Sequence, residues 1–351
     1  MQVLSKKKLN KSFSKLLIKW GYANGRNKLP WQVGTENKLD PYKVWVSEIM
    51  LQQTRVNSVL PKFNEFIKRF PKVLDLADAN YNEVLESWVG LGYYRRAKFL
   101  HTAAKIIVRK GRVKFPSSAK EWEALPGVGP STAAAISSFV NLERVAIMDS
   151  NVYRVIARFY CLTDLGSESR NRKKALELAL QLLPKDPEYM PFYSQYIMDL
   201  GALICTTKNP SCDLCPVSNS CDAKASDMID KFPVRIQKKW KEKILDWNLL
   251  IAENKILLER QFKESLWHSL FVPATKESLV SPQTPSERLF IKSYKVNVSN
   301  CKLTINVWKE KVNLNKLRLK KNQIILDVTN AREVPLPKVL VKILQDLSLS
   351  K

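Results

Sequence analysis

A glutamate lies among apolar residues in the segment DPYKVWVSEIMLQQTRV, which begins at Asp40. An aspartate that can cap a helix and the proline after it predict a helix over 41–55. Glu48 then falls on the same stripe as Val44, which we expect to be buried. Burial disfavours the charged carboxylate, so we expect a raised pKa and a proton donor at neutral pH. The alternative is a core glutamate paired with a basic neighbour such as Arg55.

A second carboxylate, Asp149, follows the apolar run RVAIM and precedes the helix NVYRVIARFY. This position predicts a helix N-cap, in which the side chain accepts hydrogen bonds from backbone N–H groups. A capping carboxylate can also stay ionised and face a cleft. The structural and the catalytic interpretations of Asp149 are therefore compatible.

Four cysteines follow one another closely in the segment CTTKNPSCDLCPVSNSC, as Cys205, Cys212, Cys215 and Cys221. Their thiolates can converge only if the loop wraps around one centre, which indicates a metal site. An iron–sulfur cluster and a zinc ion both remain open from the spacing alone. Such clustering argues against a secreted disulfide framework in a chain of this size.

The segment WEALPGVGPSTAAAISSFV (about 122–140) reads as a helix, a short glycine-containing turn and a second helix. Gly127 and Gly129 permit backbone geometries that other residues resist, and they leave the amides open to an approaching anion. The free N–H groups of the second helix point the same way, so the hairpin could hold a DNA phosphate without reading sequence. A plain Pro-Gly turn is the alternative.

These residues lie in a part of the chain that reads mainly as helices of 10–15 residues. After a polar and basic stretch come short β-rich runs, ILDWNLLIAE, KILLER, CKLTINVWKE and NQIILDVT, and a last helix over 337–347. We therefore predict a mainly α fold with a smaller C-terminal α+β domain. The predicted boundaries are 1–225 for the helical domain, 226–240 for a linker and 241–351 for the second domain.

The composition favours a globular protein with a polyanionic partner. The chain has 351 residues, 45% of them hydrophobic, and a net charge of +25 that is spread over both halves. This charge indicates binding to DNA or RNA. No apolar run approaches the ~20 residues that cross a bilayer, and the basic start is interpreted as a first helix. We expect a cytoplasmic protein without membrane partners.

Five motifs together carry a family resemblance: SEIMLQQT, LGYYRRA, LPGVG, MDSNV and the four-cysteine spacing. With them the chain resembles the endonuclease III-like helix-hairpin-helix glycosylases, and among these the MutY-type adenine DNA glycosylases, over about residues 13–225. The resemblance implies two helical subdomains with a DNA cleft between them. It also implies that the four cysteines hold one [4Fe–4S] cluster rather than zinc.

The resemblance assigns the chemistry of N-glycosidic bond cleavage. It implies that Glu48 is the catalytic acid that protonates the leaving adenine and that Asp149 stabilises the sugar cation, although Ser150 replaces the family's glycine. Asn151 would help to orient the site. At the position of Ser131 bifunctional relatives have a lysine that attacks the sugar, so this chain is predicted to be monofunctional and to use water.

The resemblance also assigns DNA contacts. Gln53 and Tyr93 match the family's residues that wedge into the base stack when the adenine is flipped out. Trp31 and Gln195 match residues that line the adenine pocket, where an amide can bond both a donor and an acceptor on adenine. For Trp31 and Gln195, packing in the core is the alternative.

The C-terminal domain is predicted to be the family's Nudix-like domain, which recognises 8-oxoguanine opposite the adenine. ESLWHSLFVPA resembles its GLWGGLY-FP stretch, with serines in place of glycines. The family's Phe-Ser-His reading loop matches Val298-Ser299-Asn300, so only Ser299 is retained. We expect a preference for adenine opposite 8-oxoguanine that is weaker than usual in the family.

The sequence therefore predicts a monomeric, monofunctional glycosylase that removes adenine mispaired with 8-oxoguanine or guanine in double-stranded DNA, in base excision repair. One alternative is another endonuclease III-like glycosylase, for a mismatch or an oxidised pyrimidine. Gln195, Ser131 and the second domain argue against it. The other is a non-catalytic iron–sulfur DNA-binding protein, which would need neither Glu48 nor Asp149.

Overall fold

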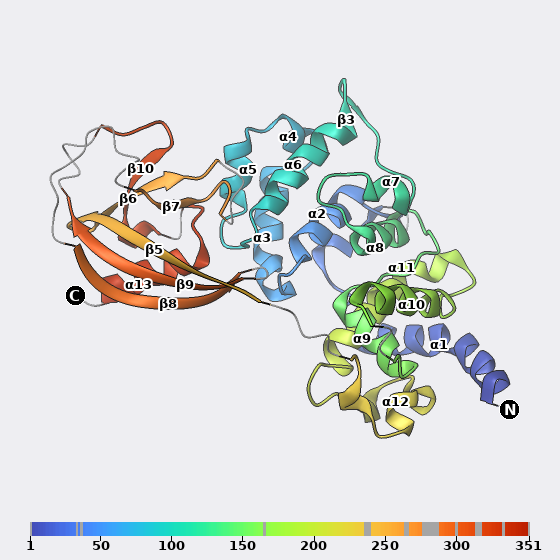
Figure 1. Cartoon of the computed structure of the whole chain (residues 1–351). Coiled ribbons are helices and arrows are strands. Elements are labelled where there is room, and N and C mark those ends of the chain that lie inside the picture. The colour runs from blue at the N-terminus through green and yellow to red at the C-terminus, as the bar shows by residue number, and fades with distance from the viewer. Residues whose placement is uncertain are drawn as a thin grey trace. The chain divides into compact units, whose positions relative to one another are not determined.

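The protein divides into two compact units in a computed structural model (Figure 1). The first unit is Met1–Asp78 with Phe99–Ile236, and the second is Ala79–Lys98 with Gln237–Lys351. The structure describes residues 2–32, 34–35, 38–163, 166–234, 240–262, 267–275, 288–298, 301–312, 318–331 and 334–349. The sequence prediction placed 79–98 in the helical domain, whereas these residues pack with the second unit. The predicted boundaries stay a prediction.

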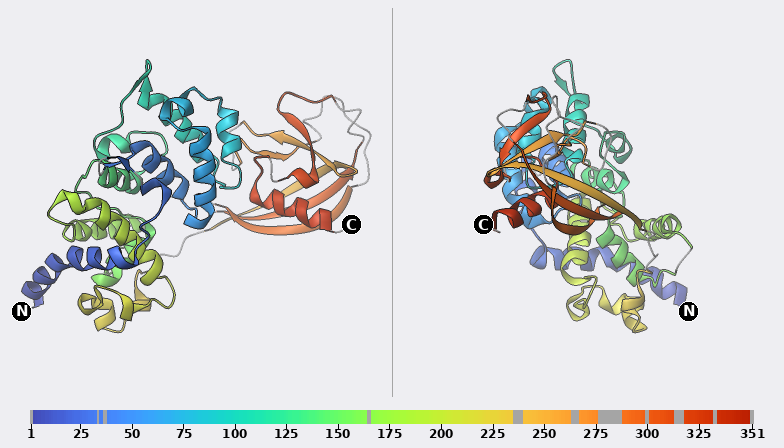
Figure 2. Two further views of the ribbon diagram at one scale, coloured as in Figure 1. Left: turned by 180° about the vertical axis from the view of Figure 1, so that it is seen from behind. Right: turned by 60° about the vertical axis from the view of Figure 1, so that its left-hand side comes forward.

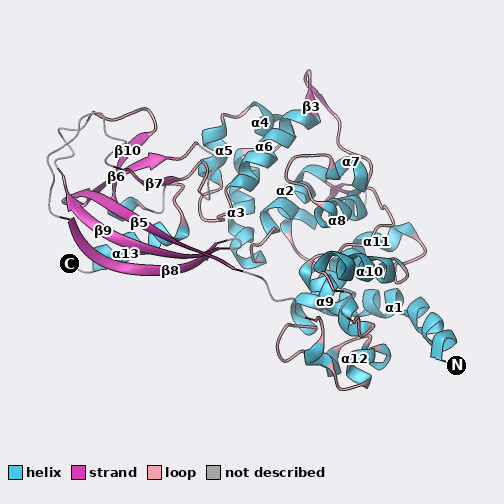
Figure 3. Cartoon of the chain, in the orientation of Figure 1, coloured by secondary structure: helices cyan, strands magenta, loops and turns pink. Residues whose placement is uncertain are grey.

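Helices dominate the first unit, as Figure 3 shows by colour. Those with α-helical geometry are α1 (Gln2–Asn24), α2 (Pro41–Leu51), α3 (Val56–Arg69), α4 (Val73–Asp78), most of α6 (Arg95–Ile107), α7 (Ala119–Glu123), α8 (Pro130–Val140), α9 (Ser150–Phe159), α10 (Glu168–Leu180), α11 (Met190–Asp199) and α12 (Asp222–Ala225). Short 3-10 turns are η1 (Pro30–Gln32), η2 (Pro187–Tyr189), η4 (Cys212–Leu214), η5 (Ser218–Ser220) and η6 (Ile229–Lys231). The described part also contains two small hairpins, β1 (Gly34–Thr35) with β2 (Lys38–Leu39) and β3 (Val108–Arg109) with β4 (Arg112–Val113).

Helix α2 is capped at its N-terminus and buried along one face. Asp40 caps it by accepting hydrogen bonds from the N–H groups of the next two residues after Pro41. Its buried face packs on α8, and Trp45 is fully buried. The predicted helix 41–55 is too long: α2 ends at Leu51, and Gln53 has a left-handed φ of 56°. A residue in this conformation does not continue a right-handed helix.

The helical segment 190–204 has two parts. Helix α11 ends at Asp199 and a π-helical turn, η3 (Leu200–Ile204), follows it directly. The turn is closed by the Cys205 N–H, which donates to the Leu200 carbonyl at 2.7 Å. Helices α11 and α1 pack together, and α11 also packs on α8 and α9.

The second unit contains a sheet with strand order β10-β6-β5-β9-β8, with β7 paired to β6. Its strands are β5 (Lys241–Ala252), β6 (Lys255–Arg260), β7 (Phe271–Pro273), β8 (Arg288–Val298), β9 (Cys301–Lys311) and β10 (Gln323–Asp327). Neighbouring strands are antiparallel except β5 and β9, which are parallel. Helix α13 (Lys338–Leu349) lies along one face of the sheet (Figure 2), and its Leu340, Ile343 and Leu344 share a buried core cluster with residues of the strands. A 3-10 turn η9 (Val328–Asn330) and helix α5 (Tyr81–Ser87) belong to the same unit.

The predicted fold class, mainly α with a smaller α+β domain, is confirmed. The run KILLER forms β6 as predicted, and the other three predicted runs form β5, β9 and β10 with small changes at their ends. Strand β8 was not predicted, although Tyr294, Val296 and Val298 alternate with polar residues. None of the described helices has the length and apolar character that a membrane crossing requires.

Candidate active site

Glu48 lies in the middle of α2, half-buried, with the buried Trp45 and Ile49 close to it in sequence on the same helix. Burial and, to a smaller extent, the charge of Asp149 raise the pKa of its carboxyl group, and Arg26 opposes them, so that the pKa lies at about 7. In the described part of the chain, no hydrogen bond or ion pair reaches this carboxylate. The carboxyl group can therefore hold a proton near neutral pH, and its proton is not used in a hydrogen bond to another described residue.

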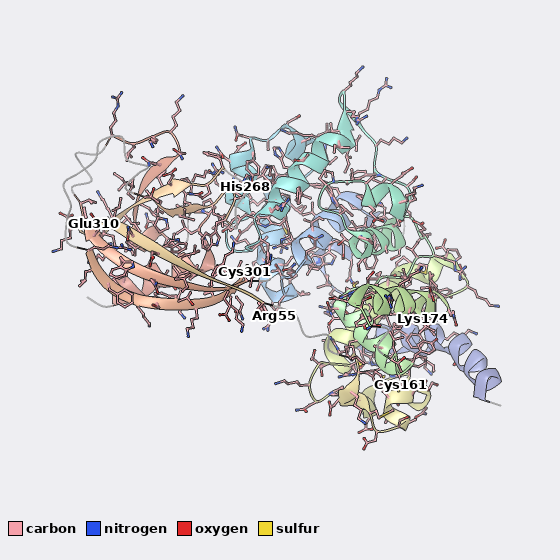
Figure 4. The ribbon with its side chains drawn as sticks, viewed as in Figure 1. Arg55, Cys161, Lys174, His268, Cys301 and Glu310 are labelled. Carbon is pink, nitrogen blue, oxygen red and sulfur yellow. The ribbon has the colours of Figure 1, made fainter. Side chains whose placement is uncertain are left out.

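The alternative pairing with Arg55 is not seen. Arg55 is exposed and lies at the N-terminal end of α3, where Figure 4 labels it. The cation that lowers the pKa of Glu48 is Arg26. Arg26 precedes α2 and lies outside the motif around Glu48, and this interaction was not predicted.

Asp149 is the N-cap of α9, as its position in the sequence predicted. Its carboxylate accepts a hydrogen bond from the Val152 N–H at 2.7 Å and one from the Asn151 side-chain amide at 3.4 Å. Burial raises the pKa of Asp149, while these hydrogen bonds oppose the rise. The charge of Asp149 is one of the causes that raise the pKa of Glu48, so the two carboxyl groups interact electrostatically.

Ser131 and Arg172 hold the residue before Asp149. The Met148 N–H donates to Ser131 Oγ at 3.3 Å, and the Met148 carbonyl accepts from Arg172 Nη1 at 3.3 Å. Ser131 belongs to the first turn of α8, and Arg172 to α10. Side chains from two helices thus hold the Met148 backbone in place, and this fixes the position of the adjacent Asp149.

Gln195 belongs to a buried network that the sequence did not reveal. Its side-chain N–H donates to Asp199 Oδ1 at 2.9 Å, and its carbonyl oxygen accepts from Gln32 Nε2 at 3.1 Å. Arg26 closes the network, because its backbone N–H and its Nε both donate to the fully buried Asp199, at 2.8 and 2.7 Å. One side-chain network therefore positions Gln195 and also Arg26, the cation that acts on Glu48.

Trp31, next to Gln32 in η1, is 4% exposed and packs edge-on against Phe63, with ring centroids 5.1 Å apart. Its indole is part of the core. A role in lining a base pocket stays a prediction.

The hairpin between α7 and α8 has the predicted form, but its two glycines are needed for different reasons. Gly127 has a φ of 79°, and a Cβ there would lie 2.6 Å from Phe99 Cβ. Gly129 has an ordinary extended backbone, so the expected special geometry is wrong for this residue. A Cβ at Gly129 would meet nothing within 4 Å, so this side of the turn is open at the start of α8.

Gln52, which precedes the predicted wedge residue, holds this hairpin. Its side-chain amide donates to the Gly127 carbonyl at 3.1 Å and to Thr132 Oγ1 at 3.1 Å. Gln53 itself is exposed with a left-handed backbone. Gln52 thus joins the C-terminal end of α2 to the hairpin between α7 and α8, whereas Gln53 is exposed.

Tyr93 belongs to the second unit. It has a φ of 49° and is 56% exposed, features that are uncommon for a tyrosine. Ser299 lies outside the described residues.

Helix α9 connects Asp149 to the four-cysteine loop through side chains one turn apart. Asn151 accepts from Arg154 Nη2 at 2.9 Å, and Arg154 also donates to the carbonyls of Gly201 and Cys205, both at 2.7 Å. Arg158, one turn further along, donates to the Thr206 carbonyl at 2.7 Å and to Cys205 Sγ at 3.4 Å. The two arginines therefore fasten the loop to the helix that Asp149 caps.

The four predicted metal ligands line one cavity, together with Arg158 and the apolar Val155, Phe159 and Leu200. These four cysteines are free thiols, and the other two, Cys161 and Cys301, lie outside this cavity. Burial, together with a smaller effect of the three neighbouring thiols, raises the pKa of the Cys215 thiol to about 12. Thiols in such surroundings ionise more readily next to a cationic group.

The four cysteines could hold a metal centre in this cavity. Four cysteine thiolates are a donor set that both structural zinc sites and iron–sulfur clusters use, and all four side chains line the same cavity.

Comparisons with known proteins show the family to which the chain belongs. Residues 46–183 match the model of the HhH-GPD superfamily base excision DNA repair proteins. An adenine DNA glycosylase of Buchnera aphidicola from Schizaphis graminum is 33% identical over an alignment of 350 positions, which covers 95% of this chain and 98% of that protein. The chain belongs to the adenine DNA glycosylase family.

Other members of the family and several solved structures also match the chain. The adenine DNA glycosylase of Buchnera aphidicola from Acyrthosiphon pisum is 35% identical over 84% of this chain and 81% of its own length. The human member is 36% identical over 61% of this chain and 39% of its own length. A thermostable thymine-DNA glycosylase matches 62% of this chain and 98% of its own with a TM-score of 0.54 and 25% identity. An endonuclease III–DNA complex matches with a TM-score of 0.50 at 17% identity, which shows the shared fold.

Residues missed by sequence reasoning are mainly partners over long distances. Arg26 and Asp199 are joined across 173 positions, and no local pattern signals this pairing. The structural role of Gln52 could have been predicted, because the family resemblance assigned a role to Gln53 and left the adjacent Gln52 without one.

Proposed function

We propose that this chain is a monofunctional adenine DNA glycosylase, which hydrolyses the N-glycosidic bond of adenine in duplex DNA as the first step of base excision repair. The observation that carries the proposal is the pair of carboxyl groups, with a protonatable Glu48 close to the hydrogen-bonded Asp149. Membership of the adenine DNA glycosylase family over almost the whole chain supports adenine as the base.

Glu48 would act as the general acid. The bond between the sugar C1′ and the adenine nitrogen breaks with its electron pair leaving on adenine, which takes the proton of Glu48. The Asp149 carboxylate would stabilise the positive charge that develops on the sugar. Water then adds to C1′, and the proton that it loses returns to Glu48. Asn151 would keep Asp149 in place through its side-chain amide.

Gln195 is proposed to contact the flipped adenine. With one N–H bonded to Asp199 and its oxygen bonded to Gln32, the amide keeps one N–H and one lone pair for a base. The network fixes the orientation of the amide, which favours a base with the matching donor and acceptor pattern. Trp31 would form an apolar wall of the same pocket.

Ser131 is proposed to make the enzyme monofunctional. Its hydroxyl accepts a hydrogen bond from Met148 and offers no amine that could form an imine with the sugar. The expected result is adenine release without efficient strand cleavage. Trapping with borohydride on DNA checks this, and a covalent protein–DNA adduct formed during turnover would contradict it.

Cys205, Cys212, Cys215 and Cys221 are proposed to bind one [4Fe–4S] cluster. The shared cavity and the Arg158 hydrogen bond to Cys205 Sγ support this proposal. When bound, the cluster would hold the loop together through four thiolate bonds. Iron and sulfide analysis of the purified protein, with Cys161→Ser as a matched control, measures this directly.

Double-stranded DNA is the proposed partner. The open turn at Gly129 would receive a phosphate, Gln53 and Tyr93 would enter the base stack, and the net charge of +25 supplies the general attraction. The bacterial relatives suggest action on the nucleoid in the cytoplasm, and a monomer suffices for the proposed site.

Preference for adenine opposite 8-oxoguanine would come from the second unit, as a Nudix-like domain. Since Ser299 is the only retained residue of the family's reading motif, we expect a weakened preference. Single-turnover rates on adenine opposite 8-oxoguanine and opposite guanine test it. Equal rates would remove this part of the proposal.

The decisive experiment is incubation of the protein with a duplex that carries adenine opposite 8-oxoguanine, followed by detection of free adenine. A duplex with thymine opposite guanine belongs in the same experiment, because the thymine-DNA glycosylase shares the fold. Release of thymine but not adenine would replace the proposed substrate. Absence of any base release, with DNA binding intact, would favour a non-catalytic DNA-binding protein.

A further inference from the structure

The loop that carries Tyr93 has an unusual backbone. Gly90, Gly92 and Tyr93 have φ values of 95°, 71° and 49°, so three of its residues are left-handed. Glycine adopts this conformation freely, whereas a bulky residue does so only where neighbours hold it. Tyr93 is also 56% exposed, so its side chain is not held by burial in the core.

Arg96, in the first turn of α6, supplies contacts that can hold this loop. Its Nη2 donates to the carbonyls of Gly92 at 3.0 Å and Leu91 at 3.4 Å, and its Nε donates to the Tyr93 carbonyl at 3.4 Å. The residue is 8% exposed, which is rare for an arginine. One guanidinium therefore bonds three consecutive carbonyls of the loop.

The same guanidinium lies between two aromatic rings. Its central carbon is 5.6 Å from the centroid of the Tyr93 ring and 5.4 Å from that of Trp88. Trp88 is fully buried, and its indole N–H donates to the Gly92 carbonyl at 3.2 Å. Arg96 thus contacts both the backbone of Tyr93 and its ring, and Trp88 supports it from the core side.

We propose that Arg96 is a positioning residue that holds Tyr93 in its exposed, left-handed conformation before DNA binds, so that the ring is ready to enter the base stack. The inference rests on the proposed function, in which Tyr93 is a wedge. Only arginine has enough directed N–H groups to serve three carbonyls and also to stack flat on a ring. Lysine keeps the charge but cannot reproduce this set of contacts.

A double-mutant cycle tests this role. Arg96→Lys should slow single-turnover adenine release about tenfold, which matches the cost of releasing one strained residue. In a Tyr93→Ala background the same change should have no further effect, because the residue that it positions is gone. A merely structural arginine would give losses that add in the double variant.

A second measurement follows the wedge itself. In a Glu48→Gln background, which should bind without cleaving, 2-aminopurine next to the mispaired adenine reports unstacking by a rise in fluorescence. The rise should be reduced by Arg96→Lys to the level of Tyr93→Ala. Arg95→Lys, the same change at the exposed neighbouring position, is the matched control and should keep the full rise.

The outcomes separate this proposal from the proposed function. If wild-type protein releases no adenine, the function falls, and the fluorescence measurement still tests Arg96. If adenine is released and Arg96→Lys equals wild type in both measurements, or the losses add, the positioning role is wrong. Should Arg96→Lys unfold by circular dichroism, Trp88→Phe replaces it in the same cycle. That variant removes the hydrogen bond to Gly92 and keeps an aromatic ring.

Discussion

The surroundings of Glu48 on α2 and of Asp149 before α9 differ in their hydrogen bonds. Both carboxyl groups are partly buried, and burial raises the pKa of both. Asp149 accepts from Val152 and Asn151, whereas no hydrogen bond of the described residues reaches Glu48. Hydrogen bonds to a carboxylate favour its ionised form, so similar burial leads to different chemistry.

This difference shows how one site can hold an acid and an anion together. The middle of a helix has no free backbone N–H groups, so a carboxyl group there gains little from its own helix. The start of a helix offers several such groups to a capping residue. The position of each carboxylate along its helix therefore favours its proposed task, and four predictions test this contrast.

The largest effect is expected for Glu48→Gln, which removes the proton donor and keeps the size of the side chain. Adenine release in a single turnover should slow by at least about 10³-fold, within the range for loss of general acid catalysis. DNA affinity should change little, because a neutral amide of the same size replaces a carboxyl group whose pKa is raised to about 7. Rates near those of wild type would place the acid elsewhere.

Asp149→Asn separates the charge from the helix cap. Asparagine caps a helix about as well as aspartate, so thermal stability should stay close to that of wild type, while adenine release falls about 10²-fold. Asp149→Ala should lose the same activity and also about 1 kcal/mol of stability through the missing cap. If Asp149→Asn kept full activity, Asp149 would be only a cap.

The pH dependence of the rate gives a smaller, graded effect. Since only protonated Glu48 can donate, single-turnover release should decline above pH 7, by about tenfold per pH unit. Removing the Asp149 charge lowers the pKa of Glu48, so the residual activity of Asp149→Asn should decline from a lower pH. An unmoved alkaline limb would show that the two groups do not interact.

Ser131→Ala should have the smallest effect. It removes one hydrogen bond, from the Met148 N–H, and leaves the Asp149 cap in place. The loss is expected at about 0.5–1 kcal/mol in stability and a few-fold in rate. Thermal melting and single-turnover release measure both. A loss as large as that of Asp149→Asn would give the Ser131 hydroxyl a direct part in catalysis.

Local patterns were sufficient to predict much of the fold and the surroundings of the two carboxylates. The apolar period around Glu48 predicted a buried helix, and the run before Asp149 predicted an N-cap, because both signals act within one or two turns. The end of α2 at Leu51 was missed, since the bonds of Gln52 to the hairpin come from a distant segment.

Long-range features were not predictable in this way. The network of Arg26, Asp199, Gln195 and Gln32 joins two ends of the first unit, and each residue alone resembles an ordinary surface or helix residue. Strand β8 was missed because Arg288, Leu289 and Phe290 at its start break the alternation that its later residues show. The roles of the site residues in catalysis and DNA binding stay predictions.

The π-helical turn η3 determines the angle about the helix axis between the residues of α11 and Cys205. Gln195 and Asp199 lie on α11, before the turn, and Cys205 comes directly after it. A π-helical turn holds one residue more than an α-helical turn, and each residue of a helix rotates the chain by about 100°. A regular α-helix would therefore place Cys205, which Arg154 and Arg158 contact, at a different angle about the helix axis. The segment therefore carries the hydrogen-bond network of Gln195 and Asp199 before the turn and the first cysteine of the loop after it.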